Sequence, residues 1–178
     1  MKIEYQGAIK RSPLQKLVAR LMLLGSGVVL SISASAQTSL ATGALPLSLA
    51  IDAATETVQV CEAKGFRVAV TIVDPDGVIK LQVRGDGSPI HSPEFSFRKA
   101  YTAIDFGAMD GVDTSSALVD KISSVAKSAA SGLLLLPGAI LIRRNGQAIA
   151  AIGVSGSPKS IDDEICAQAG IDKIKGRL

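Results

Sequence analysis

The chain is poor in the residue types that most often build nucleic-acid and zinc sites. It has no tryptophan, and aromatic residues make up 3% of its 178 residues, so it lacks the repeated stacking side chains of single-stranded nucleic-acid binders. Two cysteines and one histidine are too few for a four-ligand structural zinc site. Charged residues are also scarce at 20%, but apolar residues reach 47%, which argues against intrinsic disorder. We expect one folded domain without a nucleic-acid partner.

The first 36 residues have the pattern of a secretory signal peptide. An apolar run at residues 21–32 ends in Ala34-Ser35-Ala36, which predicts cleavage before Gln37. The run is shorter than the roughly 20 residues that span a bilayer, and an uncleaved membrane anchor is the alternative. Removing this segment lowers the formal charge from +3 to −1, because it holds five basic residues and one acid: Lys2, Lys10, Arg11, Lys16, Arg20 and Glu4. We expect a periplasmic or secreted protein with no stable membrane span after cleavage.

The rest of the chain predicts a short lead-in followed by one domain. Residues 37–46 are small and polar and are typical of a flexible segment, so the domain is expected over residues 47–178. Apolar spacings of three and four predict a helix that begins with Ser48 as N-cap and stops at Gly65. A hairpin of two strands is expected at residues 67–84. Asn145-Gly146 predicts a second hairpin, because both residues accept the positive φ of a type I′ turn.

Helices and one more strand are expected between and after the hairpins. Ser92-Pro93 begins a helix with Ser92 as N-cap, residues 113–131 have a second helical pattern, and the short apolar run Leu133–Leu136 is interpreted as a strand. The last helix begins at Ser160, with acids in its first turn that suit the helix dipole: Asp162, Asp163 and Glu164. Helices before, between and after antiparallel strands predict an α+β fold, with an antiparallel sheet flanked by helices.

Two cysteines lie in apolar stripes of predicted helices. In an oxidising compartment Cys61 and Cys166 either stay buried as small apolar side chains or form a disulfide that closes a loop of about 105 residues. Neither has neighbours that would activate a thiolate. A cysteine nucleophile is therefore not expected.

Four stretches together resemble one known family. They read RGDGSPIH at Arg84–His91, RKAYTA at Arg98–Ala103, AAIGVSGSP at Ala150–Pro158 and DDEICAQAGIDKI at Asp162–Ile174. In this order they are similar to the GlcG/HbpS family, also called the haem-degrading domain family. The resemblance implies a profilin-like or PAS-like α/β sandwich, assembly into homo-oligomers, and haem binding or degradation in some members. The chain departs from the family near residues 137–141, where Pro137 and Ala139 replace glycines.

The helix after Ser92 holds four of the five aromatic residues that follow residue 36. At 100° per residue, Phe95, Thr102 and Phe106 share one side, while Phe97, Tyr101 and Ile104 lie opposite. One side can pack on the sheet, and the other must meet a ligand, another helix or a second subunit. We take this second apolar side as a further reason to expect a homo-oligomer.

The same segment supplies the candidate ligand-binding residues, namely His91, Phe95, Arg98, Lys99, Tyr101 and Thr102. Apolar walls with a cation suit a small flat or acidic ligand such as haem. His91 or Tyr101 is the candidate ligand of the haem iron, and His91 is the candidate catalytic base because it is the only imidazole. Ordinary core packing with an interface is the competing interpretation.

These observations predict an exported, oligomeric protein that binds haem or a similar ligand and that can support haem degradation. One alternative is an enzyme that acts on a small organic acid without haem, with His91 as general base. Another is an accessory or sensor protein without catalysis.

Overall fold

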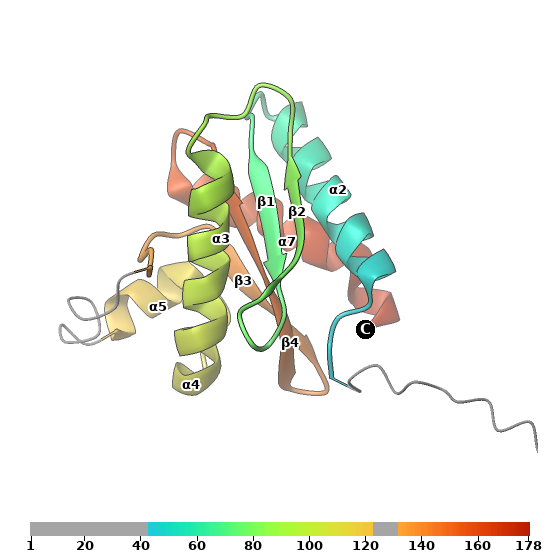
Figure 1. Ribbon diagram of the computed structural model, residues 1–178, viewed down its shortest axis with the longest axis vertical. Coiled ribbons are helices and arrows are strands. Elements are labelled where there is room, and N and C mark those ends of the chain that lie inside the picture. The colour runs from blue at the N-terminus through green and yellow to red at the C-terminus, as the bar shows by residue number, and fades with distance from the viewer. Residues whose placement is uncertain (1–42, 123–131) are drawn as a thin grey trace, which may run out of the picture. The chain divides into compact units, whose positions relative to one another are not determined.

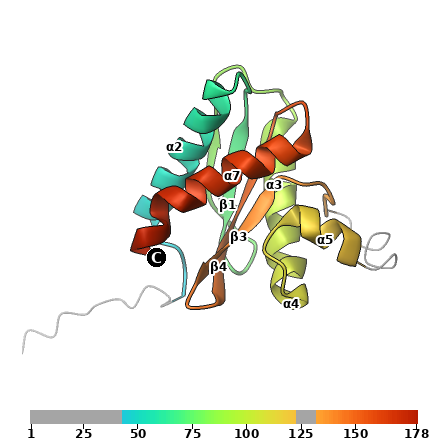
Figure 2. The same ribbon diagram turned by 180° about the vertical axis from the view of Figure 1, so that it is seen from behind.

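The computed structural model describes residues 43–122 and 132–178, so the expected signal peptide, most of the expected lead-in and residues 123–131 of the expected second helix lie outside the described part. The chain forms a four-stranded antiparallel sheet with helices on both faces (Figures 1 and 2). In chain order the elements are α2 (Leu47–Ala63), β1 (Ala69–Val73), β2 (Ile79–Arg84), α3 (Ser92–Thr102), the π-helical turn η1 (Ala103–Gly107), α4 (Ala108–Asp110), α5 (Ser115–Lys121), β3 (Ala139–Arg144), β4 (Gln147–Ser155), α7 (Ser160–Ile174) and the 3-10 turn η2 (Lys175–Arg177). The predicted α+β class is confirmed.

The sheet has the strand order β2-β1-β4-β3. All five residues of β1 are buried, because β1 lies inside the sheet and both of its faces are covered. Helices α2 and α7 cover one face (Figure 2), and α3 crosses the other (Figure 1). The larger apolar core lies under α2 and α7 and includes Val70 and Ile72, while a smaller one lies under α3 and includes Val73.

Turn chemistry sets both hairpins as predicted. Asn145 and Gly146 have φ angles of 51° and 81° between β3 and β4, the positive values that a type I′ turn requires. In the first hairpin, Gly77 takes a φ of 76°, and one carboxylate oxygen of Asp74 accepts the backbone N–H groups of Asp76 and Val78, both at 3.0 Å. These local bonds close the turn between β1 and β2.

Two helix starts and one strand differ from the prediction. Pro46, and not Ser48, is the N-cap of α2, and His91, and not Ser92, is that of α3. The run Leu133–Leu136 is irregular rather than a strand. Its backbone is bonded to α3 instead of to a neighbouring strand: Thr102 Oγ1 accepts the N–H of Leu134 at 2.9 Å. A backbone satisfied by side chains does not need a sheet partner.

The closest contact between α3 and the sheet is made by small residues, and Phe97 packs at the edge of the smaller apolar core. Ser96, Ala100 and Ala103 are buried on the inward side of the helix. Opposite them, a Cβ added to Gly153 of β4 would collide with the carbonyl oxygen of Ser96 and the backbone nitrogen of Ala100. This glycine therefore allows helix and strand backbones to approach closely. Phe97 therefore lies at the flank, between this core and the outward side of α3 where Tyr101 lies.

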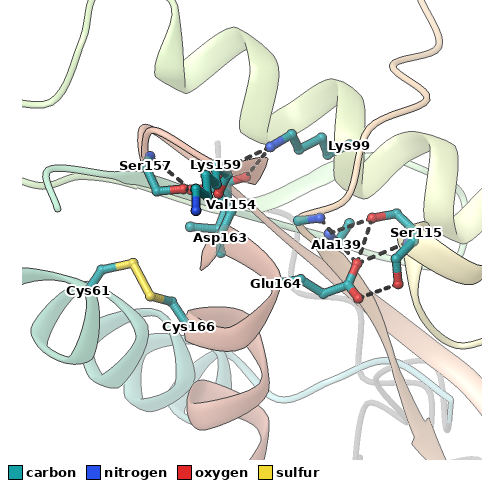
Figure 3. Close-up of polar contacts among 12 residues, drawn as sticks. Cys61, Lys99, Ser115, Ala139, Val154, Ser157, Lys159, Asp163, Glu164 and Cys166 are labelled. Carbon is teal, nitrogen blue, oxygen red and sulfur yellow. Dashed lines mark hydrogen bonds and ion pairs between the residues drawn. A yellow bond between two sulfur atoms is a disulfide. The ribbon is translucent and has the colours of Figure 1, made fainter. Parts of the chain in front are cut away.

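The disulfide joins the two helices of the opposite face. Cys61 of α2 and Cys166 of α7 form a disulfide with a Cα–Cα distance of 5.6 Å (Figure 3), and both residues are fully buried. Beside this bridge, Gly170 of α7 lies so close to α2 that an added Cβ would overlap Thr57 and the carbonyl of Ala53. Of the two expected arrangements of the cysteines, the structure contains the bridged one.

Candidate ligand-binding site

A hollow of about 500 Å³ lies on the outward side of α3. Among the described residues, those that line it are Glu94, Phe97, Arg98, Tyr101 and Gly132. The four helical residues are spaced by three or four positions, so they share one face of α3. Gly132 belongs to the segment that is bonded to this helix. The hollow thus lies on the side of α3 opposite the buried small residues.

Two aromatic rings form the apolar wall of the hollow. The ring centroids of Phe97 and Tyr101 are 5.9 Å apart, with the planes inclined at 53°, within the range of favourable aromatic pairs. The Tyr101 ring also lies over the turn between β1 and β2, where an added Cβ on Gly77 would be 2.8 Å from its Cε2. Gly77 is therefore needed twice, for its positive φ and for the space that Tyr101 occupies.

Arg98 is the cation of the hollow, and its guanidinium is held by backbone. Its Nε donates to the carbonyl of Gly132 and its Nη2 to that of Leu133, both at 3.1 Å. Its Nη1 lies 3.6 Å from Oε1 of Glu94, an ion pair longer than a hydrogen bond. A guanidinium has five N–H donors, so Arg98 keeps donors for a ligand carboxylate.

Lys99, the neighbouring predicted cation, points into the protein. Its side chain is 2% exposed, and Nζ lies 2.7 Å from Oδ2 of Asp163, whose own side chain is 2% exposed. Nζ also donates to the carbonyl of Val154 at 3.1 Å, and the other Asp163 oxygen accepts the N–H of Ser157 at 3.0 Å (Figure 3). Lys99 therefore has no access to the hollow.

Thr102, another predicted ligand residue, is buried and acts on the chain itself. Its hydroxyl donates to the carbonyl of Arg98 at 2.7 Å and accepts the N–H of Leu134. Together with Arg98 it ties residues 132–134 to α3. Its place in the structure is therefore behind the wall of the hollow.

His91 and Phe95 lie near the start of α3 and do not line the hollow. His91 is exposed, and its ring centroid is 4.9 Å from that of the half-buried Phe95. Ten helical residues correspond to about 15 Å along the axis. His91 and Tyr101 of one chain therefore cannot both ligate the same iron. The other aromatic of that predicted side, Phe106, packs against an apolar cluster of the same chain: Val112, Leu118 and Ile122.

A second buried carboxylate, which the sequence interpretation assigned to the helix dipole, connects α7 to α5. One oxygen of Glu164 accepts three hydrogen bonds, from the Ser115 hydroxyl at 3.1 Å and from the N–H groups of Ser116 at 3.0 Å and Gly138 at 3.2 Å. The Ser115 hydroxyl in turn accepts the N–H of Ala139 (Figure 3). This network fixes the start of β3 and is structural.

Residues 43–122 and 132–178 contain neither a cluster of metal-ligating side chains nor a helix that could span a membrane. In these ranges no three histidine, cysteine, aspartate or glutamate side chains are grouped so that they could hold a metal ion. Across the same ranges, no helix has the length and apolar character needed to cross a membrane.

Several solved structures are similar to this chain. HbpS of Streptomyces reticuli, crystallised as a double mutant, is 32% identical, with 72% of this chain and 86% of that chain covered at a TM-score of 0.64. PduOC, crystallised as a complex with haem, is 23% identical over 74% of this chain and 95% of that one, with a TM-score of 0.65. The ORFY protein of Klebsiella pneumoniae is 20% identical over 74% and 90%, with a TM-score of 0.65. The latter two likenesses concern the fold. A search of curated proteins finds no match.

The family assignment depends on the sequence as a whole. The model of the family described as haem-degrading, HbpS-like proteins matches residues 45–172. This range is most of the chain and includes α3, the helix that lines the hollow. The resemblance noted in the four sequence stretches is confirmed. The chain belongs to the HbpS-like family of haem-degrading proteins.

Proposed function

We propose that this protein binds haem in the hollow on the outward side of α3. The observation that carries the proposal is the combination, in one hollow, of two aromatic rings with an arginine held by backbone carbonyls. Membership of a haem-degrading family supports it, as does a solved relative of the same fold that is a haem complex.

The residues of the hollow fit the chemistry of haem. Haem is a flat apolar ring with carboxylates at one edge, so it needs apolar walls and a cation. Phe97 and Tyr101 supply the walls and Arg98 the cation. A volume of about 500 Å³ lies within the usual range of small-molecule sites, and the open side allows part of a larger ring to remain outside.

Tyr101 is our candidate for the iron ligand. A tyrosine oxygen is an established axial ligand of haem iron, and bound iron would supply redox chemistry with oxygen or peroxide. Tyr101 lines the hollow and is partly exposed there. His91 is exposed and outside the hollow, so we assign it no role in this site.

Haem titration followed by absorption spectroscopy tests the proposal. We expect saturable binding with a shifted Soret band. Tyr101→Phe should alter the charge-transfer and Soret bands because it removes the oxygen and keeps the ring. His91→Ala is the matched control and should leave the spectrum unchanged. A spectrum that responds to His91→Ala and not to Tyr101→Phe would contradict the assignment.

The family description favours a second step, oxidative breakdown of the bound haem. Loss of the Soret band in the presence of oxygen and a reductant, with release of a linear tetrapyrrole, tests it. An intact Soret band under the same conditions would limit the protein to haem binding.

We also propose that the protein is exported and works in the periplasm or outside the cell. The sequence pattern of residues 1–36 supports this. The buried disulfide between Cys61 and Cys166 supports it independently, because such bridges persist mainly in oxidising compartments. The predicted homo-oligomer remains a prediction.

A further inference from the structure

The hollow contains its own carboxylate. Glu94 lies one helical turn before Arg98, and its Oε1 is 3.6 Å from Nη1 of that arginine. Both side chains line the hollow. The Glu94 side chain is 67% exposed and the Arg98 side chain 31%, so the pair is at the rim and in contact with solvent. The glutamate therefore faces the donors that a ligand carboxylate would use.

Arg98 cannot turn away from this neighbour to meet a ligand elsewhere. Hydrogen bonds from Nε and Nη2 to the carbonyls of Gly132 and Leu133 fix the orientation of the guanidinium plane. The remaining donors on Nη1 point to the side where Glu94 lies. Because that contact is longer than a hydrogen bond, Nη1 is attracted to the Glu94 carboxylate but donates no hydrogen bond to it.

We infer that Glu94 is a specificity-determining residue, which competes with a ligand carboxylate for Arg98 and thereby reduces the preference of the hollow for carboxylate ligands over neutral ones. A ligand with a carboxylate must displace the Glu94 charge from Nη1, whereas a neutral ligand of the same shape leaves the ion pair in place. Displacement is easy because exposed ion pairs contribute little. The inference rests on the proposed haem site and adds to it the group that sets how strongly the site discriminates among flat ligands.

The test compares two porphyrins and two variants. Haem carries free propionates, and its dimethyl ester has the same ring without charge. Glu94→Gln removes the competing charge at nearly constant shape. Asp110→Asn is the matched control, because it removes the same charge from an exposed residue of α4 that does not line the hollow. Dissociation constants are measured by Soret titration of the full chain at low and at high salt.

We expect Glu94→Gln to tighten haem binding about two- to fivefold at low salt, with a smaller gain at high salt, where exposed charges are screened. Binding of the dimethyl ester should stay within twofold of the parent protein, and Asp110→Asn should change neither. Circular dichroism should show the parent fold, because Glu94 is at the surface.

Three results would overturn the inference. The first is an equal gain for haem and its ester, which would indicate a general effect on the aromatic wall. The second is an equal gain with Asp110→Asn, which would indicate net charge alone. The third is weaker haem binding by Glu94→Gln, which would mean that Glu94 orients Arg98 and does not compete with the ligand. Failure of the parent protein to bind either porphyrin would instead reject the haem site itself.

Discussion

Replacing Lys99 by methionine should destabilise the protein without weakening haem binding. Methionine keeps the length and the apolar part of the side chain, so the change removes mainly the charge. In the structure that charge lies 2.7 Å from Asp163, and each side chain is 2% exposed. The sequence alone suggested the opposite outcome, because Lys99 lies beside Arg98 and is the second cation of the aromatic helix.

The expected loss follows from what remains after the substitution. Asp163 would keep its bond from the N–H of Ser157 but would lose its only cation among the described residues. Breaking a buried ion pair by removing one partner typically costs about 3–5 kcal/mol. The carbonyl of Val154 would also lose a donor. Total stabilities are about 5–15 kcal/mol, so a large part of the margin is lost.

Urea denaturation and haem titration measure the two effects separately. The unfolding midpoint of Lys99→Met should fall strongly, while its haem affinity, measured without urea, should stay within twofold of the parent value. Adding Asp163→Asn should recover at least about 1 kcal/mol, because no uncompensated charge then remains buried. A stability loss below about 1 kcal/mol together with tenfold weaker haem binding would refute the reasoning and place Lys99 in the ligand site.

Three further results are expected. Replacing Cys61 and Cys166 together by alanine should lower the free energy of unfolding by about 4–5 kcal/mol, since the bridge spans 105 residues; equal urea midpoints for the two proteins would contradict this. Gly153→Ala should cost about 1–3 kcal/mol or more in thermal unfolding, because the added methyl meets the backbone of Ser96; an unchanged Tm would show that α3 yields freely. N-terminal sequencing of the protein from the cell envelope should begin after Ala36, and an intact leader in the membrane fraction would favour the anchor.

Local sequence signals predicted the elements whose structure is decided locally. The Asn145-Gly146 turn and the alternation of strand residues need only neighbours in sequence, and both hairpins are present. Leu133–Leu136 had an equally apolar pattern and is no strand. Its backbone is bonded to Arg98 and Thr102, more than thirty residues earlier. A pattern of apolar residues cannot distinguish these two environments.

The sequence did not predict which residues of α3 face the sheet and which face outward. The sequence assigned one aromatic side of the helix to the sheet, but the closest approach is made by Ser96, Ala100 and Ala103, with Phe97 at the edge of the contact. Close packing at Gly153 selects small side chains there. Phe97 and Tyr101 are consequently displaced to the flank and the outward face, where they become available to a ligand. The signal that sequence reasoning missed was Gly153 in β4, because this glycine faces α3 and leaves room only for small residues there.

The opposite roles of Arg98 and Lys99 show how a helix separates identical charges. Adjacent residues differ by 100° around the axis, so one cation reaches the hollow and the other the interior. The sequence held a signal that a buried carboxylate needs a partner, but not which cation supplies it. Asp163 lies three residues before Cys166 and four before Ala167, both fully buried, so within the first turn of α7 it belongs to the buried stripe. A carboxylate on a buried stripe requires a cation or several hydrogen-bond donors. Because α7 and α3 lie on opposite faces of the sheet, only the fold reveals that the partner, Lys99, reaches Asp163 at the sheet end.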